Sequence, residues 1–438
     1  MAAPLRGRVG FWLYAAHLYA LVGIAASNVL AGLTLLSAPW TAQAARAAPV
    51  PLPAPLAAAR RALVSAVGLY VVFLLVSIAA SYDPRTSLRA TSELFTLATL
   101  GLGLVLVRGE RAVRRVVDGL VAVGALAAIW GLAQTLFGYG ELDRRIRGPF
   151  SHWMTFAGFL LVCDLLLAAY LLFPPDGRRS RADGAADTDD RPSPADRDPP
   201  SAAVRNRILA ARAWRWAAFA AINAALVVSL TRSVWVALAA ALVVAVGLRK
   251  PRALVLGPAA ALVFVLAAPV PLVARALSIA DLSDPSNYDR LCMAEAGLHM
   301  IAERPLTGLG PEMVERRYPI YRPPTAPRYT VPHLHDTFLQ LAAERGLPAL
   351  AAYLAMVAAA LAAAWIGFRR EGGRTGPRAD LWLGALLALV AFNVAGLFEN
   401  NWGDTEVQRL VLFVMALPFC LGAPGSSAAP AEAARPSS

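Results

Sequence analysis

The chain has 438 residues, of which 58% are hydrophobic and only 16% are charged, and its formal net charge is +12. This composition excludes an ordinary soluble protein and predicts an all-α polytopic membrane protein, because helices satisfy their own backbone hydrogen bonds inside a bilayer. The positive charge does not indicate nucleic-acid binding, since the arginines are scattered through loops between apolar spans without a platform of aromatic and basic residues.

The first apolar run covers residues 9–38. It is too long for a single crossing of a hydrocarbon layer of about 30 Å unless it tilts strongly. The polar break at Ser27 and Asn28 therefore predicts two short helices that form a hairpin. Later spans bring the expected total to about twelve transmembrane helices. They lie near residues 62–80, 91–107, 113–137, 154–173, 214–230, 233–248, 253–272, 347–368, 380–398 and 407–423.

Short loops that carry arginine set the expected orientation. If the spans alternate, residues 108–115, 249–252 and 369–378 lie on one side together with the segment 174–207. Positively charged loops tend to stay in the cytoplasm, so this side is expected to be cytoplasmic. With a hairpin in the first run, both termini are expected there as well.

The chain thereby divides into six parts. The segment 174–207 mixes arginine and aspartate with almost nothing to bury, and the end of the chain is rich in Ala, Pro and Ser, so disorder is expected in both. The expected parts are an N-terminal transmembrane half at 1–173, a disordered cytoplasmic linker at 174–207, transmembrane helices at 208–272, a large and partly helical external loop at 273–346, C-terminal transmembrane helices at 347–423 and a disordered tail at 424–438.

Arginines on the external face run against the positive-inside tendency and therefore require a cause. Arg147 lies in the loop 138–153, and Arg232 lies where two apolar spans meet. A guanidinium fork beside the membrane suits a lipid phosphate or pyrophosphate. The alternative for each is a side chain that reaches the interface or forms a salt bridge. The neighbouring Arg144 and Arg145 are weaker candidates, because hydration alone explains them.

The long external loop contains a helical pattern at 290–303, a turn with two glycines at 305–311, and a crossing rich in proline and tyrosine. It leads into a short amphipathic helix pattern. Gly346 is expected to end this helix, and Pro348 is well placed to start the next one.

His333 and His335 lie just before this helix, for which Asp336 or Thr337 is the expected N-cap. The free N–H groups and dipole of the helix N-terminus suit an anion such as phosphate, and an imidazole can take a proton from a sugar hydroxyl near neutral pH. A His-x-His pair can also bind zinc, but no cysteine or third histidine is near in sequence, and a carboxylate ligand would have to come from elsewhere in the fold. We therefore expect neither a metal nor a cofactor.

Several motifs occur in order along residues 140–350, and none is specific by itself. They are Arg147-Gly148-Pro149-Phe150, Leu230-Thr231-Arg232-Ser233, Tyr288-Asp289-Arg290, Pro305-Leu306-Thr307-Gly308-Leu309-Gly310, His333-Leu334-His335-Asp336-Thr337 and Glu344-Arg345-Gly346-Leu347, with a weaker match at Phe398-Glu399-Asn400. Their order and placement resemble the O-antigen ligase family of polytopic membrane glycosyltransferases. The chain departs from the family pattern at Asp336, where asparagine is usual, and at Ser151-His152-Trp153, where asparagine-proline-asparagine is usual.

The resemblance implies transfer of a glycan from an undecaprenyl-pyrophosphate carrier to an acceptor hydroxyl, at the periplasmic face of the inner (cytoplasmic) membrane and without a metal. It also implies that His335 activates the acceptor and that Arg147 and Arg232 hold the pyrophosphate. Supporting positions are His333, Asp336, Arg290 and Glu344. A single displacement with a histidine base predicts inversion at the anomeric carbon.

Three acceptors remain open, namely lipid A–core, another growing glycan and a protein hydroxyl. A polysaccharide polymerase and a protein O-oligosaccharyltransferase are therefore alternatives to a ligase. Outside the enzymes, the alternative is a transporter or binding protein for lipid-linked sugars. Such a transporter needs two similar halves and polar residues in mid-span, and the sequence has neither feature clearly.

Overall fold

The computed structural model describes residues 2–46, 51–174, 202–257, 266, 270–281 and 283–422. Within these ranges every regular element is a helix, which confirms the all-α prediction. Eight helices of the described chain are long and apolar enough to cross a bilayer, so the protein is a multi-pass membrane protein. The expected total of about twelve is not confirmed by this number.

The helices of the bundle are α1 (Ala2–Tyr19), α2 (Ile24–Arg46), α3 (Ala54–Ala79), α5 (Ser92–Leu106), α6 (Glu110–Ala133), α7 (Trp153–Leu172), α8 (Ala202–Val228), α9 (Arg232–Arg249), α14 (Thr337–Arg370), α15 (Ala379–Gly396) and α16 (Thr405–Cys420). The long loop contributes α11 (Val270–Leu277), α12 (Pro285–Glu303) and α13 (Met313–Tyr321). Short elements are α4 (Pro84–Ser87) and the 3-10 turns η1 (Ala20–Val22), η2 (Leu88–Thr91), η3 (Gln134–Phe137), η5 (Pro251–Leu256), η6 (Gly373–Thr375) and η7 (Asn401–Gly403).

The first apolar run forms the predicted hairpin, because α1 and α2 pack along one another. The break was predicted at the wrong residues. It lies at η1 and Gly23, where the backbone is extended with φ −140°, whereas Ser27 and Asn28 are inside α2. Both polar side chains are satisfied there by tertiary partners. Ser27 donates to the carbonyl of His17 at 3.0 Å, and Asn28 accepts a hydrogen bond from Arg409 at 2.7 Å.

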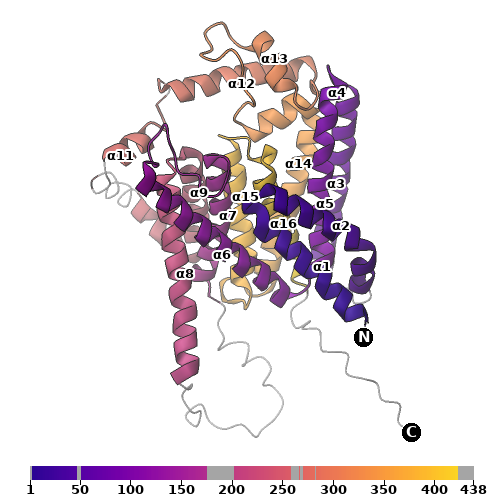
Figure 1. Ribbon diagram of the computed structural model, residues 1–438, viewed down its shortest axis with the longest axis vertical. Coiled ribbons are helices and arrows are strands. Elements are labelled where there is room, and N and C mark those ends of the chain that lie inside the picture. Colours follow the sequence, from indigo (N-terminus) through magenta and orange to yellow (C-terminus); the bar gives the residue numbers. More distant parts are fainter. Residues whose placement is uncertain are drawn as a thin grey trace.

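The centre of the bundle is formed by α7, α15 and α16 (Figure 1). Nearly all of their side chains are buried. Around them, α14 packs along α3, and α15 packs against both α7 and α9. The sequences of the central helices are continuous apolar runs, because every face of these helices packs against another helix.

The short arginine-bearing loops meet at one end of the bundle. The backbone N–H of Gly109 donates to Cys420 at 2.7 Å, and Arg378 donates to the carbonyl of Leu421 at 2.8 Å. Arg249, at the end of α9, donates to the carbonyl of Leu172, at the end of α7. These contacts agree with the predicted grouping on one side. That this side faces the cytoplasm remains a prediction.

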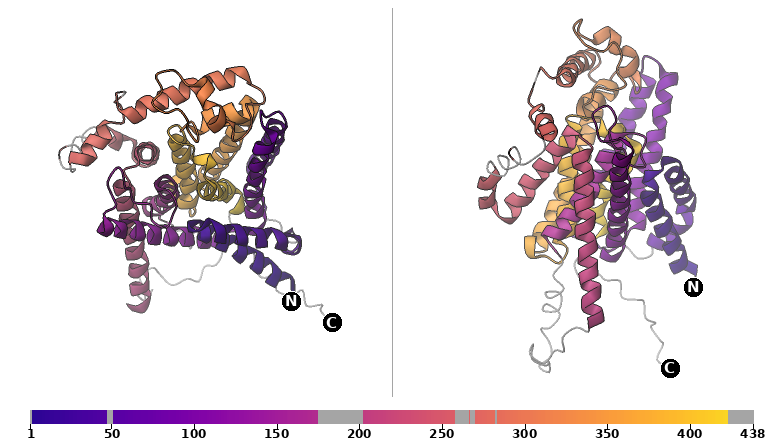
Figure 2. Two further views of the ribbon diagram at one scale, coloured as in Figure 1. Left: turned by 45° about the horizontal axis from the view of Figure 1, so that its top comes forward. Right: turned by 60° about the vertical axis from the view of Figure 1, so that its left-hand side comes forward.

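At the opposite end, α12 and α13 lie across the bundle (Figures 1 and 2). The predicted helix at 290–303 is confirmed and begins five residues earlier. The glycine-containing turn docks on α14, where Leu309 donates to the carbonyl of Ala343 at 2.9 Å and Leu347 donates to that of Pro305 at 2.8 Å. Between these contacts Gly346, at φ 81°, breaks α14 as predicted, and a Cβ there would lie 2.3 Å from the carbonyl oxygen of Leu306.

Three expectations fall wholly or partly outside the described residues. Most of the predicted linker lies there, but its last residues, from 202, belong to α8, because they continue a run of good helix formers. The predicted tail at 424–438 lies outside entirely. Of the predicted span at 253–272, only 253–257, 266 and 270–272 are described, and they belong mainly to η5 and α11.

Candidate functional site

Asp336 shapes the segment that leads into α14. Its carboxylate is the N-cap and accepts hydrogen bonds from the backbone N–H groups of Phe338 and Leu339, both at 2.8 Å, as predicted for this position. The cap is one that asparagine also makes, so the departure from the family pattern preserves it. Burial raises the pKa of Asp336, and the two N–H groups oppose that rise. Immediately before the cap, His335 has a left-handed backbone with φ 52°, which costs an ordinary residue about 1 kcal/mol or more.

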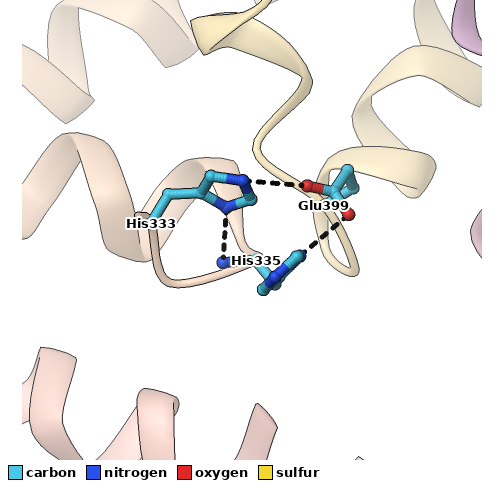
Figure 3. Close-up of side chains that lie close together, drawn as sticks. All are labelled: His333, His335 and Glu399. Atoms are coloured by element: carbon cyan, nitrogen blue, oxygen red, sulfur yellow. Dashed lines mark hydrogen bonds and ion pairs between the residues drawn. The ribbon is translucent and has the colours of Figure 1, made fainter. Parts of the chain in front are cut away.

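A carboxylate from a distant part of the chain faces His335. Glu399 follows α15, is only 5% exposed, and places Oε2 at 2.9 Å from Nδ1 of His335 (Figure 3). Its backbone is held by the hydroxyl of Thr337, which donates to the Glu399 carbonyl at 3.0 Å. Because Thr337 starts the helix that His335 precedes, the two segments are fixed relative to each other.

The protonation of this pair follows from its surroundings. Burial alone would raise the pKa of Glu399, but the hydrogen bond with His335 and the positive charge of Arg290 lower that pKa overall. An ionised carboxylate only accepts hydrogen bonds, so Nδ1 of His335 carries the hydrogen. In the neutral form of this imidazole the lone pair is then on Nε2. A carboxylate behind a histidine in this way orients the ring and stabilises the imidazolium that forms when Nε2 takes a proton.

His333 completes the cluster from the other side of Glu399. Its Nδ1 accepts a hydrogen bond from the backbone N–H of His335 at 3.3 Å, and its Nε2 lies 3.7 Å from Oε1 of Glu399 (Figure 3). Burial lowers the pKa of His333 to about 4, so the ring is neutral near pH 7. A neutral ring that accepts at Nδ1 has its hydrogen on Nε2, where it points toward the carboxylate.

The same three side chains have the spacing of a metal site. Ligand atoms of His333, His335 and Glu399 all lie within 4.8 Å of one another. Two imidazoles and a carboxylate suit zinc, and Glu399 is the carboxylate that the sequence alone did not provide. With Nδ1 of His333 accepting a hydrogen bond, its Nε2 carries the hydrogen, so a metal at Nε2 would require a change of tautomer and the loss of that hydrogen bond.

Arg232 begins α9 and lies on the same side of the bundle, 6% exposed. Its guanidinium donates to the carbonyl and hydroxyl of Ser278, at 2.9 and 2.8 Å, and to Asp284 at 3.3 Å. It also donates to Ser286 and, at 3.0 Å, to Asn287. Arg232 therefore ties α9 to the start of α12, and its terminal N–H groups already have protein partners.

Three further arginines lie close enough to Arg232 for their charges to interact. Burial lowers the pKa values of Arg145, Arg275 and Arg290, and the positive charge of Arg232 lowers each of them further. The Nε atom of Arg275 is buried without a partner in the described chain. The charge of Glu399 acts on Arg290, so the arginines and the histidine cluster share one electrostatic environment. A cluster of partly buried arginines is suited to binding a multiply charged anion.

Arg147 is exposed at the edge of this region and donates to the carbonyl of Ser151 at 3.1 Å. The side chain of Gln134 shapes its loop by accepting the backbone N–H of Arg147 at 2.9 Å. His152 caps α7 close by. Burial lowers its pKa, and the charge of Glu399 opposes this effect. The structure thus brings Arg147, Arg232 and His335 to one side of the bundle, with Arg147 at the rim.

Glu344 has a different position from the other predicted supporting residues. It is 5% exposed and accepts a hydrogen bond from the backbone N–H of Val314 at 3.5 Å, while its own carbonyl accepts from Ser77 at 2.7 Å. It therefore anchors the external loop to α14 and α3.

Residues 216–354 match the O-antigen ligase family. The chain carries an O-antigen ligase domain. This match supports a membrane glycosyltransferase-like ligase or polymerase, in agreement with the resemblance seen in the motifs. No curated protein matches the sequence.

The O-antigen ligase domain contains Arg232, Arg290 and His335, but the site extends beyond it. Glu399 and Arg145 lie outside residues 216–354 and reach the site only through the fold. Sequence reasoning assigned no role to Glu399, although the weak motif Phe398-Glu399-Asn400 in a short connection between two apolar spans was a usable signal. Arg275 follows the predicted span at 253–272 and belongs to none of the motifs described above.

Proposed function

We propose that this O-antigen ligase domain transfers a glycan from an undecaprenyl-pyrophosphate carrier to an acceptor hydroxyl, at the external face of the inner membrane, with inversion and without a metal. The observation that carries the proposal is the orientation of His335 by Glu399, which leaves Nε2 as a base. The domain match supports the reaction class, and the arginine cluster supports a pyrophosphate-linked donor.

In the proposed reaction, the acceptor hydroxyl gives its proton to Nε2 of His335 while its oxygen forms a bond to the anomeric carbon. The bond from that carbon to the pyrophosphate oxygen breaks, and the electron pair leaves with the lipid pyrophosphate. Glu399 stabilises the imidazolium that results. General base catalysis of this kind contributes about 10²-fold to 10⁴-fold in rate.

The leaving pyrophosphate gains negative charge, so fixed cations lower the barrier. Among the arginines, Arg145, Arg275 and Arg290 form no ion pair within the described residues, which favours them as direct ligands. Arg232 contributes its charge and holds the loop, and direct contact with pyrophosphate requires the anion to displace Asp284. Arg147, at the rim, is proposed to meet the donor as it enters.

The test is to incubate the purified protein with an undecaprenyl-pyrophosphate glycan and with lipid A–core, a free glycan or a protein acceptor, and to identify products by mass spectrometry. The wild type is expected to transfer the glycan, and His335→Ala to lose transfer while remaining folded. His299→Ala is the matched control, because His299 is exposed on α12. Elongated glycan as the sole product would identify a polymerase, whereas carrier-linked glycan bound but never consumed would favour the transporter alternative.

A further inference from the structure

Glu93, near the start of α5, receives hydrogen bonds from four side chains of the bundle. Its Oε1 accepts from the hydroxyl of Tyr70 at 2.8 Å, the indole N–H of Trp402 at 3.0 Å and the amide of Gln408 at 3.2 Å. Its Oε2 accepts from Arg345 at 2.8 Å in an ion pair whose side chains are 12% and 10% exposed. One carboxylate thereby joins α3, α5, η7, α14 and α16.

Two of these donors belong to the segments that carry the candidate base pair. Trp402 lies three residues after Glu399, in the connection between α15 and α16, and is 2% exposed. Arg345 lies on α14, which begins directly after His335 and Asp336. Glu93 therefore holds the Glu399 segment and the His335 segment to one fixed point that belongs to neither.

The energetics favour a rigid anchor. A buried carboxylate that loses its donors retains the full cost of desolvation, so the donors do not separate from it readily. The ring of Trp402 is also packed, with its centroid 4.8 Å from that of Tyr353 and 6.2 Å from that of Tyr70. Because Trp402 is only three residues from Glu399, we expect a shift of Trp402 to displace Glu399 relative to Nδ1 of His335.

We propose that Glu93 is a positioning residue for glycan transfer, which holds Glu399 against His335 through Trp402 and Arg345. This rests on the proposed function, in which the His335–Glu399 pair acts as the base. Glu93 itself acts through these neighbours.

Trp402→Phe is the mildest test, since it removes the N–H that reaches Glu93 and keeps an aromatic ring in the core. Tyr353→Phe is the matched control, because it also removes one buried hydrogen bond, from Tyr353 to Asn393 at 2.9 Å, without touching Glu93. Misplacement of a reacting group is costly, so Trp402→Phe is expected to lower kcat by about tenfold or more at unchanged KM for the donor. The kcat of the control variant is expected to stay within about twofold of the wild-type kcat.

A double-mutant cycle separates positioning from general stability. If Trp402 acts through Glu399, Trp402→Phe lowers kcat no further in a Glu399→Gln background, and Glu93→Gln behaves in the same way. The proposal is overturned if the losses multiply, or if Trp402→Phe and Tyr353→Phe are equally active.

Hydrogen exchange of the peptide covering 397–404 gives a readout that does not need transfer. This peptide is expected to exchange faster in Trp402→Phe and Glu93→Gln than in Tyr353→Phe. If the wild type shows no transfer, the proposed function fails while this measurement still decides whether Glu93 anchors the Glu399 segment. Equal exchange in all variants refutes the anchor.

Discussion

Glu399 Oε2 lies 2.9 Å from His335 Nδ1, although the two residues are 64 positions apart in the chain. The two segments meet because α14 and α15 pack together and because Thr337 bonds to the Glu399 backbone. In the proposed function, this contact orients a loop histidine as the base. The chemistry proposed for this protein depends on that contact.

Glu399→Gln tests the charge of the carboxylate while preserving its size. The amide oxygen can still accept from Nδ1, but the imidazolium loses its counter-charge, so transfer is expected to fall by about 100-fold or more. The measurement is kcat by mass spectrometry of the product, with thermal unfolding of each variant as the control for folding. Transfer within a factor of two of the wild type would remove Glu399 from the mechanism.

Arg290→Ala tests the proposed direct contact with pyrophosphate. A charge-assisted hydrogen bond contributes about 1.5 to 3 kcal/mol, so KM for the donor is expected to rise by about tenfold to 100-fold, with the acceptor KM unchanged. Arg144→Ala is the control, because Arg144 lies over the Tyr139 ring, with its guanidinium carbon 4.2 Å from the ring centroid. A rise in the acceptor KM alone would contradict the assignment.

Arg232→Ala is expected to affect both stability and donor use. It leaves Asp284 without its ion-pair partner and releases the start of α12, at a cost of about 3 kcal/mol in the free energy of unfolding. Donor binding is expected to weaken in parallel, because α12, which carries Arg290, is no longer tied to α9. Unchanged thermal unfolding together with weak donor binding would instead show that Arg232 contacts the donor directly.

Chelation distinguishes a proton-transfer site from a metal site. With His335 acting as a base, transfer is expected to continue at its full rate after EDTA treatment and dialysis. The readout is product formation before and after chelation, together with metal analysis of the purified protein. Loss of activity that zinc restores would favour a metal held by His333, His335 and Glu399.

The pH dependence of the free energy of unfolding is expected to reflect the lowered pKa of His333. Its pKa is lowered by burial from 6.5 to about 4, so between these values the unfolded chain binds a proton that the folded ring does not. The free energy of unfolding is therefore expected to fall as the pH drops from about 6.5 toward 4, and this contribution is fully present above 6.5. His333→Gln should flatten that dependence, measured as the difference in Tm between pH 7 and pH 5. The same slope in His299→Gln and His333→Gln would count against a buried neutral His333.

The sequence by itself determined the all-α membrane class, the grouping of the arginine-bearing loops, the helix at 290–303 and the break at Gly346. These features follow from hydropathy, helical period and the special backbone of glycine, all of which act over a few turns. Its motifs also pointed to the O-antigen ligase family, which the domain match supports. The hairpin break was misplaced because Ser27 and Asn28 are paired by partners outside their own helix.

Only the tertiary structure decided which charges face one another. Glu399 contacts His335, and Asp284 forms an ion pair with Arg232. Glu93 accepts a hydrogen bond from Trp402. Each contact joins residues far apart in the chain and arises from helix packing. Periodicity shows that a face is buried, but it carries no record of the partner across that face. The sequence left open whether Arg232 binds a ligand or a carboxylate, and the fold pairs it with Asp284. In the same way, the fold alone brings Glu399 to His335.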